Sequence, residues 1–125
     1  MDEDNIIVQK SKSFSLKIIT LYKFLVDEKK EYVLSKQILK SGTSIGANIK
    51  EAIRGQSKAD FYAKMNISLK EASETEYWLE LLKESNYIPS EVFRESYTQC
   101  QELLRILMAI TKTQRKEILS THIDH

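Results

Sequence analysis

Residues 40–52, KSGTSIGANIKEA, form the densest run of small and polar residues in the chain. The run contains Gly42 and Gly46, two of the protein's three glycines. Such a run is typical of a loop that binds phosphate, or of a helix whose small residues let another helix come close. The choice between these two structures decides whether an active site should be sought here.

The phosphate-loop interpretation fails on spacing. A loop of this kind has four residues between its two glycines and continues with Lys-Ser or Lys-Thr. Here three residues separate Gly42 from Gly46, and Ala47 and Asn48 follow. The dinucleotide pattern G-x-G-x-x-G is absent as well, and the flanking sequence has helical rather than strand periodicity.

Placed on a helix, the same residues form part of an apolar stripe. At about 100° per residue, Gly42 and Gly46 fall on the same side as the neighbouring isoleucines. A glycine inside a helix costs about 1 kcal/mol relative to alanine, so two glycines need compensating packing. They are therefore predicted to form a contact notch for a neighbouring helix. Ser41 and Asn48 share one flank of the stripe and are expected to bond to an adjacent helix or subunit.

Four helices are predicted from apolar residues that recur every three or four positions. The segments run from about Ile7 to Asp27, from Ser35 to Gly55, from Ser57 to Asn86 and from Ser90 to Ile118. Connections of this length favour antiparallel neighbours. The predicted fold is all-α, an antiparallel up-down-up-down four-helix bundle formed by residues 1–125 as a single domain, with residues 1–6 and 119–125 flexible.

The helix boundaries and seams give more detailed expectations. Serines that precede an apolar periodic segment are favourable N-caps, which predicts caps at Ser35, Ser57 and Ser90. The apolar seam of the third helix is predicted to start at Phe61, and the stripe of the fourth helix is predicted to reach Ile118.

Composition excludes several classes of protein. The net charge is +1, and no apolar run approaches the roughly 20 residues that a membrane span needs. The acidic N-terminus lacks a signal-peptide pattern. The single cysteine, Cys100, rules out an internal disulfide and suits a reducing cytoplasm. A cytoplasmic protein without membrane contact is expected.

Catalytic and metal chemistry are not predicted. Carboxylate bundles that bind two metal ions use Glu-x-x-His pairs, but the only histidines, His122 and His125, lie in the C-terminal tail. Cys100 falls on an apolar stripe, where a buried, inert thiol is usual. Lys70 and Glu74 are spaced for an ion pair along one helix. No cofactor, no metal and no enzyme activity are expected.

Two motifs make the chain similar to a known family. The first motif, Ser-[Ile/Val]-[Gly/Pro]-Ala-Asn-Ile-x-Glu, is matched by Ser44, Ile45, Gly46, Ala47, Asn48, Ile49 and Glu51. The second, of the type Lys-Glu-Ala-x-Glu-Thr-x-Tyr-Trp-Leu, is matched by Lys70, Glu71, Ala72, Glu74, Thr75, Tyr77, Trp78 and Leu79. Over roughly residues 10–115 the chain resembles the bacterial 23S rRNA intervening-sequence proteins.

This resemblance implies a left-handed antiparallel bundle that assembles as a homopentamer. The chain is also similar to the accessory variability determinant of diversity-generating retroelements, a pentamer of the same fold that binds nucleic acid and a reverse transcriptase. The resemblance suggests helix packing or an interface as the role of Ser41, Gly42, Ser44, Gly46, Asn48, Glu51, Lys70, Glu74 and Trp78. For Trp78, core packing and a subunit interface are equally compatible with the sequence.

Charge is distributed unevenly in the expected bundle. Both ends of the chain would meet at one end of the bundle, with the end of the second helix and the start of the third. The basic residues predicted to cluster there are Lys10, Lys12, Lys17, Lys50, Arg54, Lys58, Lys64, Arg105, Lys112, Arg115 and Lys116. Such a cluster attracts phosphate backbones without reading sequence.

Two functions remain open at this stage. The first is a non-enzymatic oligomeric scaffold that binds nucleic acid, RNA rather than DNA, through Lys10, Lys12, Lys50, Arg54, Lys58, Lys112, Arg115 and Lys116. The alternative is a protein-binding adaptor, in which the same residues complement helix dipoles and keep the surface soluble.

Overall fold

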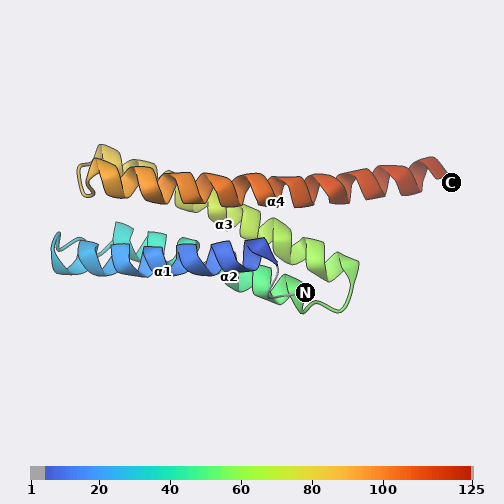
Figure 1. The fold of residues 1–125 in the computed structure, drawn as a ribbon, viewed down its shortest axis with the longest axis horizontal. Helices are drawn as coiled ribbons and strands as arrows, with labels where there is room; N and C mark the ends of the chain where they lie inside the picture. Colours follow the sequence, from blue (N-terminus) through green and yellow to red (C-terminus); the bar gives the residue numbers. More distant parts are fainter. Residues whose placement is uncertain (1–4, 125) are drawn as a thin grey trace.

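The computed structural model describes residues 5–124, with side chains described as far as residue 119. The chain forms four helices: α1 (Ile6–Asp27), α2 (Leu34–Ile53), α3 (Lys58–Glu84) and α4 (Ser90–Asp124). Figure 1 shows that each helix runs opposite to the one before it. Within the described residues there is no strand, and the predicted all-α four-helix bundle is confirmed.

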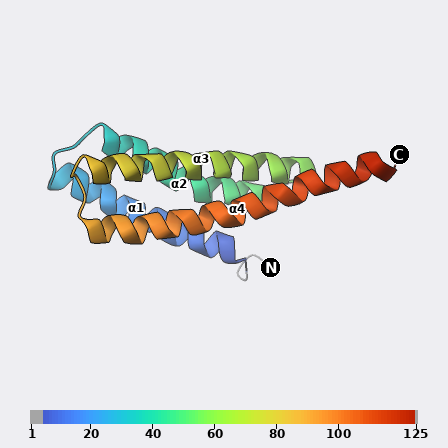
Figure 2. The same ribbon diagram turned by 90° about the horizontal axis from the view of Figure 1, so that it is seen from above.

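The four helices form a square in cross-section. α2 packs between α1 and α3, and α4 packs on α3 and closes the square against α1. Figures 1 and 2 together place α2 and α3 on one side and α1 and α4 on the other. The contact between α1 and α4 is the loosest of the four.

The helices do not end at the same level. α4 has 35 residues and α1 has 22, and the C-terminal turns of α4 project past the start of α3. α1 starts well back from that end (Figure 1). The segment 119–124, expected as part of a tail, continues α4, whereas residues 1–4 and 125 lie outside the described residues.

The caps of two helices are formed by short polar side chains. The Asn5 side chain accepts a hydrogen bond from the N–H of Ile7 (3.2 Å), and Ser57 accepts one from the N–H of Asp60 (3.1 Å). Each of these side chains pairs a backbone N–H of the first helical turn that has no acceptor within the helix. The predicted cap at Ser57 is therefore confirmed.

The predicted cap at Ser35 is wrong. α2 begins one residue earlier, and the Glu31 carboxylate accepts hydrogen bonds from the N–H groups of Val33, Leu34 and Ser35. The Ser35 hydroxyl donates back to the Glu31 carbonyl oxygen (2.8 Å). A carboxylate can accept several bonds at once and suits the positive end of the helix dipole. The helix α4 likewise starts at Ser90 itself rather than after it.

The core follows the predicted seams with two corrections. In α3, Met65, Ser68, Ala72, Thr75, Leu79 and Leu82 are buried, as the heptad spacing predicts. At the first position of this seam Tyr62 is buried and Phe61 is only half-buried. Ile118 is exposed because this part of α4 lies past the start of α1 and has fewer neighbours.

Candidate nucleic-acid interface

The glycines of the 40–52 segment lie in α2, against α1. A Cβ added at Gly42 would lie 2.9 Å from the Ile18 side chain, which is closer than real Cβ contacts. A Cβ at Gly46 would lie 3.3 Å from the Ser11 hydroxyl oxygen and 3.4 Å from that of Ser15. The two positions therefore allow α1 and α2 to pack closely, most tightly at Gly42.

Hydroxyl groups join α3 to α2 inside the bundle. The Thr75 hydroxyl oxygen lies 2.8 Å from the Ser41 hydroxyl oxygen, and the Ser68 hydroxyl donates to the Ile45 carbonyl oxygen (2.9 Å). All of these groups are buried, so each hydrogen bond avoids the cost of an unpaired polar group. Within the monomer the Asn48 amide donates to Ser44 of its own helix (2.8 Å), and its predicted bond to another subunit stays a prediction.

The remaining motif residues lie toward the outside of α2 and α3. Glu51 is exposed and pairs with Lys64 of α3 (2.9 Å). Lys70 and Glu74 are also exposed, but the ion pair expected between them is absent from the part of the chain described. Trp78 is half-buried, and its indole N–H is enclosed without an acceptor. Its side chain packs against the core from one side.

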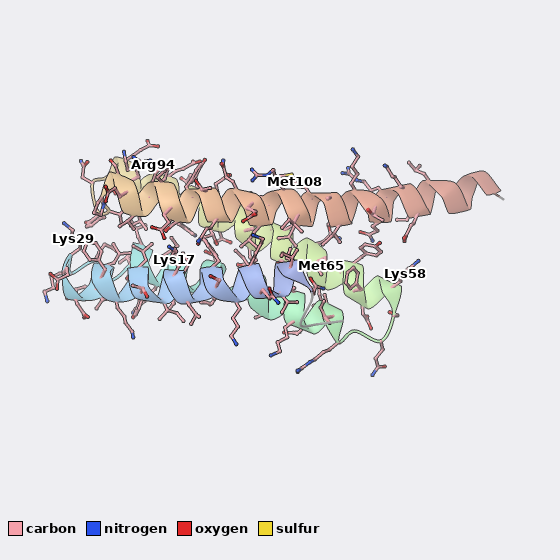
Figure 3. All side chains as sticks on the ribbon, viewed as in Figure 1. Lys17, Lys29, Lys58, Met65, Arg94 and Met108 are labelled. Carbon is pink, nitrogen blue, oxygen red and sulfur yellow. The ribbon has the colours of Figure 1, made fainter. Side chains whose placement is uncertain are left out.

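The structure separates the basic residues of α1 from the basic end. Lys17 pairs with Glu95, and Lys10 pairs with Glu102 (3.0 Å). These two ion pairs hold Lys10 and Lys17 alongside the first half of α4. Lys12 is exposed on another side of α1, and its part in a nucleic-acid interface stays a prediction. Figure 3 shows Lys17 and Arg94 toward one end of the molecule and Lys58 at the other. The reason is that α1 starts beside the middle of α4, well back from the C-terminal end of that helix.

The basic end that remains is formed by α2, α3 and α4. We define it as Lys50, Arg54, Lys58, Lys64, Lys112, Arg115 and Lys116. Within it Lys58 pairs with Glu117 (3.6 Å) and Lys64 with Glu51. In the described part of the chain the other five form no ion pair and are exposed.

An open groove lies at the junction of α2 and α3 within the basic end. Lys50, Arg54 and Lys64 line it on the basic side. Glu51, Gly55, Gln56 and Asp60 complete its polar wall. The connection between the two helices is short, so it holds the end of α2 close to the start of α3. The groove gathers Lys50, Arg54 and Lys64 beside the Glu51 and Asp60 carboxylates, and Lys and Arg side chains are among those that contact phosphate oxygens.

Two titratable groups of the bundle, Cys100 and Tyr97, have raised pKa values. Burial raises the pKa of the Cys100 thiol from 9.0 to about 12, and the thiol donates to the Ala72 carbonyl oxygen (3.3 Å). A hydrogen bond to Glu80 (2.6 Å) raises the pKa of Tyr97 to about 12. Both groups are therefore protonated at neutral pH, and a protonated thiol is a poor nucleophile.

Neither a metal site nor a membrane-spanning helix is found within the part of the chain that the structure describes. Among residues 5–119 no three metal-ligating side chains lie close enough to hold an ion. No helix in the described part is both long and apolar enough to cross a bilayer.

The fold and the site together define a small helical-bundle protein with a charged end. Comparison with known families gives a more specific result. The sequence profile described as 23S rRNA-intervening sequence protein matches residues 3–109. The chain belongs to this family, which confirms the resemblance seen in its two motifs.

A solved structure agrees with this assignment. The chain is similar to a protein of unknown function from the S23 ribosomal protein family of Bacteroides thetaiotaomicron VPI-5482, whose crystal structure was determined at 1.70 Å resolution. The two are 55% identical, with a TM-score of 0.84, over 87% of this chain and 97% of that chain. A search of proteins with curated functions found no match.

Proposed function

We propose that this protein is a non-enzymatic, self-associating scaffold that binds the phosphate backbone of nucleic acid, RNA in preference to DNA, through its basic end. The observation that carries the proposal is the set of exposed cations without an ion pair, Lys50, Arg54, Lys112, Arg115 and Lys116, at one end of a nearly neutral protein.

Helix-dipole complementarity does not account for all of these cations. Lys50 and Arg54 lie at the C-terminal end of α2, where a positive charge is favourable without any ligand. Lys112 lies about three turns before the end of α4, whereas the effect of the dipole fades within the last turn. A role in attracting an external anion explains why basic residues extend along the part of α4 that lies beside the start of α3.

Self-association would increase the binding strength. A single basic end offers only a few phosphate contacts. A ring of identical subunits repeats the same contacts on one molecule and raises affinity through effective concentration. The homopentamer and the RNA preference are both suggested by the family, and this chain would share them.

The decisive experiment measures binding over a range of salt concentrations. The purified oligomer is titrated with a structured RNA and with a DNA duplex of equal length. If the protein binds the phosphate backbone, the logarithm of the binding constant should fall linearly with the logarithm of the salt concentration. The RNA should bind more tightly than the DNA duplex. Absence of binding at low salt would exclude the nucleic-acid role and leave the protein-binding adaptor as the function to test.

A further inference from the structure

The helix α3 has two apolar sides, although its own chain covers only one. Its inner side forms the buried seam against α2 and α4. On the outer side Ile67 is 42% exposed, and Trp78 and Leu81 are half-buried. Apolar residues all around a helix are typical of a helix with neighbours on every side. The outer side of α3 therefore lacks a neighbour within the monomer.

Charged residues of both signs surround this outer side. Lys40 of α2 and Lys70 of α3 lie near Glu71, and burial followed by the neighbouring Glu74 raises the pKa of the Glu71 carboxyl. We use the term α2–α3 face for Lys40, Ile67, Lys70, Glu71, Glu74, Trp78 and Leu81. An apolar centre with a rim of mixed charge is the usual composition of a protein–protein interface.

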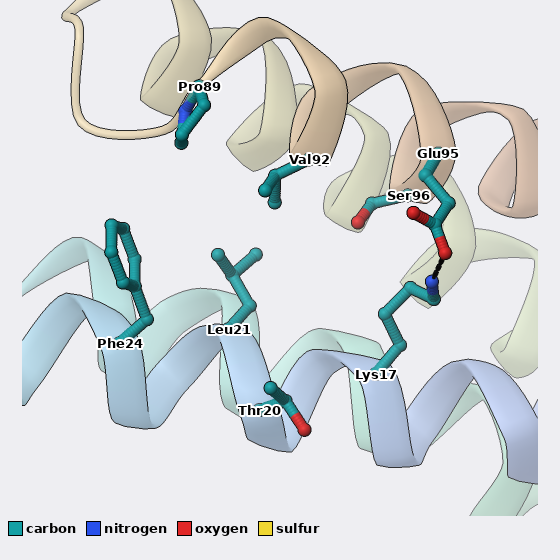
Figure 4. Close-up of a pocket in the computed structure, with 8 residues that line it drawn as sticks. All are labelled: Lys17, Thr20, Leu21, Phe24, Pro89, Val92, Glu95 and Ser96. Carbon is teal, nitrogen blue, oxygen red and sulfur yellow. Dashed lines mark hydrogen bonds and ion pairs between the residues drawn. The ribbon is translucent and has the colours of Figure 1, made fainter.

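A complementary surface lies on the opposite side of the bundle. Between α1 and α4, Leu21, Phe24, Pro89 and Val92 line an apolar groove of about 290 Å³. Figure 4 shows Leu21 and Phe24 facing Val92 and Pro89 across it, with the Lys17–Glu95 ion pair at one edge. Pockets for small molecules usually have 300–1,000 Å³, so this groove suits a few apolar side chains better than a cofactor.

We propose that the α2–α3 face of one copy of this chain docks in the α1–α4 groove of the next copy. The charge pattern supports a second copy as the occupant, because both surfaces have an apolar centre beside a lysine and a glutamate. Lys17 and Glu95 can exchange partners with Glu74 and Lys70. The inference rests on the self-association in the proposed function and specifies which surfaces meet.

The position of the two surfaces determines the kind of assembly. They lie on opposite sides of the bundle, as Figures 1 and 2 show. An interface between two different surfaces is heterologous, and repeated heterologous contacts close into a ring when the rotation allows it. Each copy in the ring would use both of its surfaces.

One variant for each surface, with a matched control, tests the pairing. Ile67→Glu places a charge in the α2–α3 face, and Val92→Glu, at a residue 37% exposed, places one in the groove. Ile118→Glu is the control, because Ile118 is exposed (48%) near the C-terminal end of α4 and lies outside both surfaces. Circular dichroism verifies that each variant is folded, and light scattering gives its mass.

The expected result is specific to a heterologous interface. Ile67→Glu and Val92→Glu should each be monomeric at concentrations at least tenfold above those at which the wild type assembles, whereas Ile118→Glu keeps the wild-type mass. Mixing the two monomeric variants should give a one-to-one heterodimer, because one intact pair of surfaces remains.

Other outcomes are distinguishable. If the wild type assembles but only one variant dissociates, or the mixture stays monomeric, the proposed pairing is wrong. If both variants keep the wild-type mass, the interface lies elsewhere. A monomeric wild type would instead overturn the self-association in the proposed function, while the salt titration tests nucleic-acid binding separately.

Discussion

Gly42 of α2 lies so close to Ile18 of α1 that a Cβ on residue 42 would be 2.9 Å from two carbon atoms of the isoleucine. Ile18 is fully buried and branched at Cβ, so it has little freedom to move away. The separation of α1 and α2 therefore depends on the absence of a side chain at residue 42.

Substitution at the two helix glycines should have different effects. Gly42→Ala is expected to lower the free energy of unfolding by about 1–3 kcal/mol, because overpacking outweighs the gain in helix propensity. Gly46→Ala is the control and should change it by less than about 1 kcal/mol, since its contacts are looser, at 3.3–3.4 Å. Denaturant unfolding measures both.

A larger side chain at residue 46 should not be tolerated. Gly46→Leu would push against Ser11 and Ser15 of α1 and is expected to perturb folding or assembly. If this variant has the stability and mass of the wild type, the close α1–α2 packing is not required.

The buried pair of hydroxyls between α2 and α3 should be energetically coupled. Thr75→Val leaves the buried Ser41 hydroxyl without its 2.8 Å partner and should cost about 1–3 kcal/mol. Ser41→Ala should cost less, because the Thr75 hydroxyl can still donate to the Glu71 carbonyl oxygen (2.8 Å). The double variant should cost less than the sum, because the Ser41 hydroxyl is then no longer left unpaired. Double-mutant-cycle unfolding tests this, and strict additivity would show that the two hydroxyls do not interact.

Alkaline pH should destabilise the fold through Cys100. Its pKa is raised in the folded state, so the native protein holds its proton while the unfolded chain loses it. The stability contribution is complete below pH 9.0 and decreases up to about pH 12, by at most about 1.4 kcal/mol per pH unit. Unfolding at several pH values measures the decrease, which Cys100→Ala should reduce between pH 9 and 10.

Tyr97 provides the control for this prediction. Its pKa is also raised to about 12, mainly by the hydrogen bond to Glu80, so it should contribute at higher pH than Cys100. Tyr97→Phe should reduce the decrease between pH 9 and 10 much less than Cys100→Ala does, because the unfolded tyrosine ionises near pH 10.0 and the unfolded cysteine near pH 9.0. Stability that is constant from pH 8 to 11 in the wild type would contradict both assignments.

Apolar periodicity predicts the helices and most of the core because burial follows the 3.6-residue repeat. The errors arise where a local interaction or tertiary geometry decides the outcome. Glu31 caps α2 from outside the periodic segment, and Ile118 is exposed because α1 does not reach it. Neither feature can be derived from spacing along one helix.

The candidate site was less predictable than the fold. The sequence places the ends of α2 and α3 together, which predicts that Lys50, Arg54 and Lys58 share one end. It does not give the position along the bundle at which α1 starts. This position brings Lys10 beside Glu102 and Lys17 beside Glu95 of α4. The apolar α1–α4 groove is also a product of tertiary packing, since α1 and α4 are neighbours only in the folded chain.

The most direct test of the central claim is the salt dependence of RNA binding in charge variants of the basic end. Arg54 and Arg115 are exposed there, and Lys36, an exposed lysine in the first turn of α2 at the other end, provides the matched control. Arg54→Glu and Arg115→Glu should weaken binding and reduce the log–log salt slope by about 1 or more for each site lost, while Lys36→Glu keeps the wild-type slope. Equal slopes in all three variants would contradict binding through the basic end.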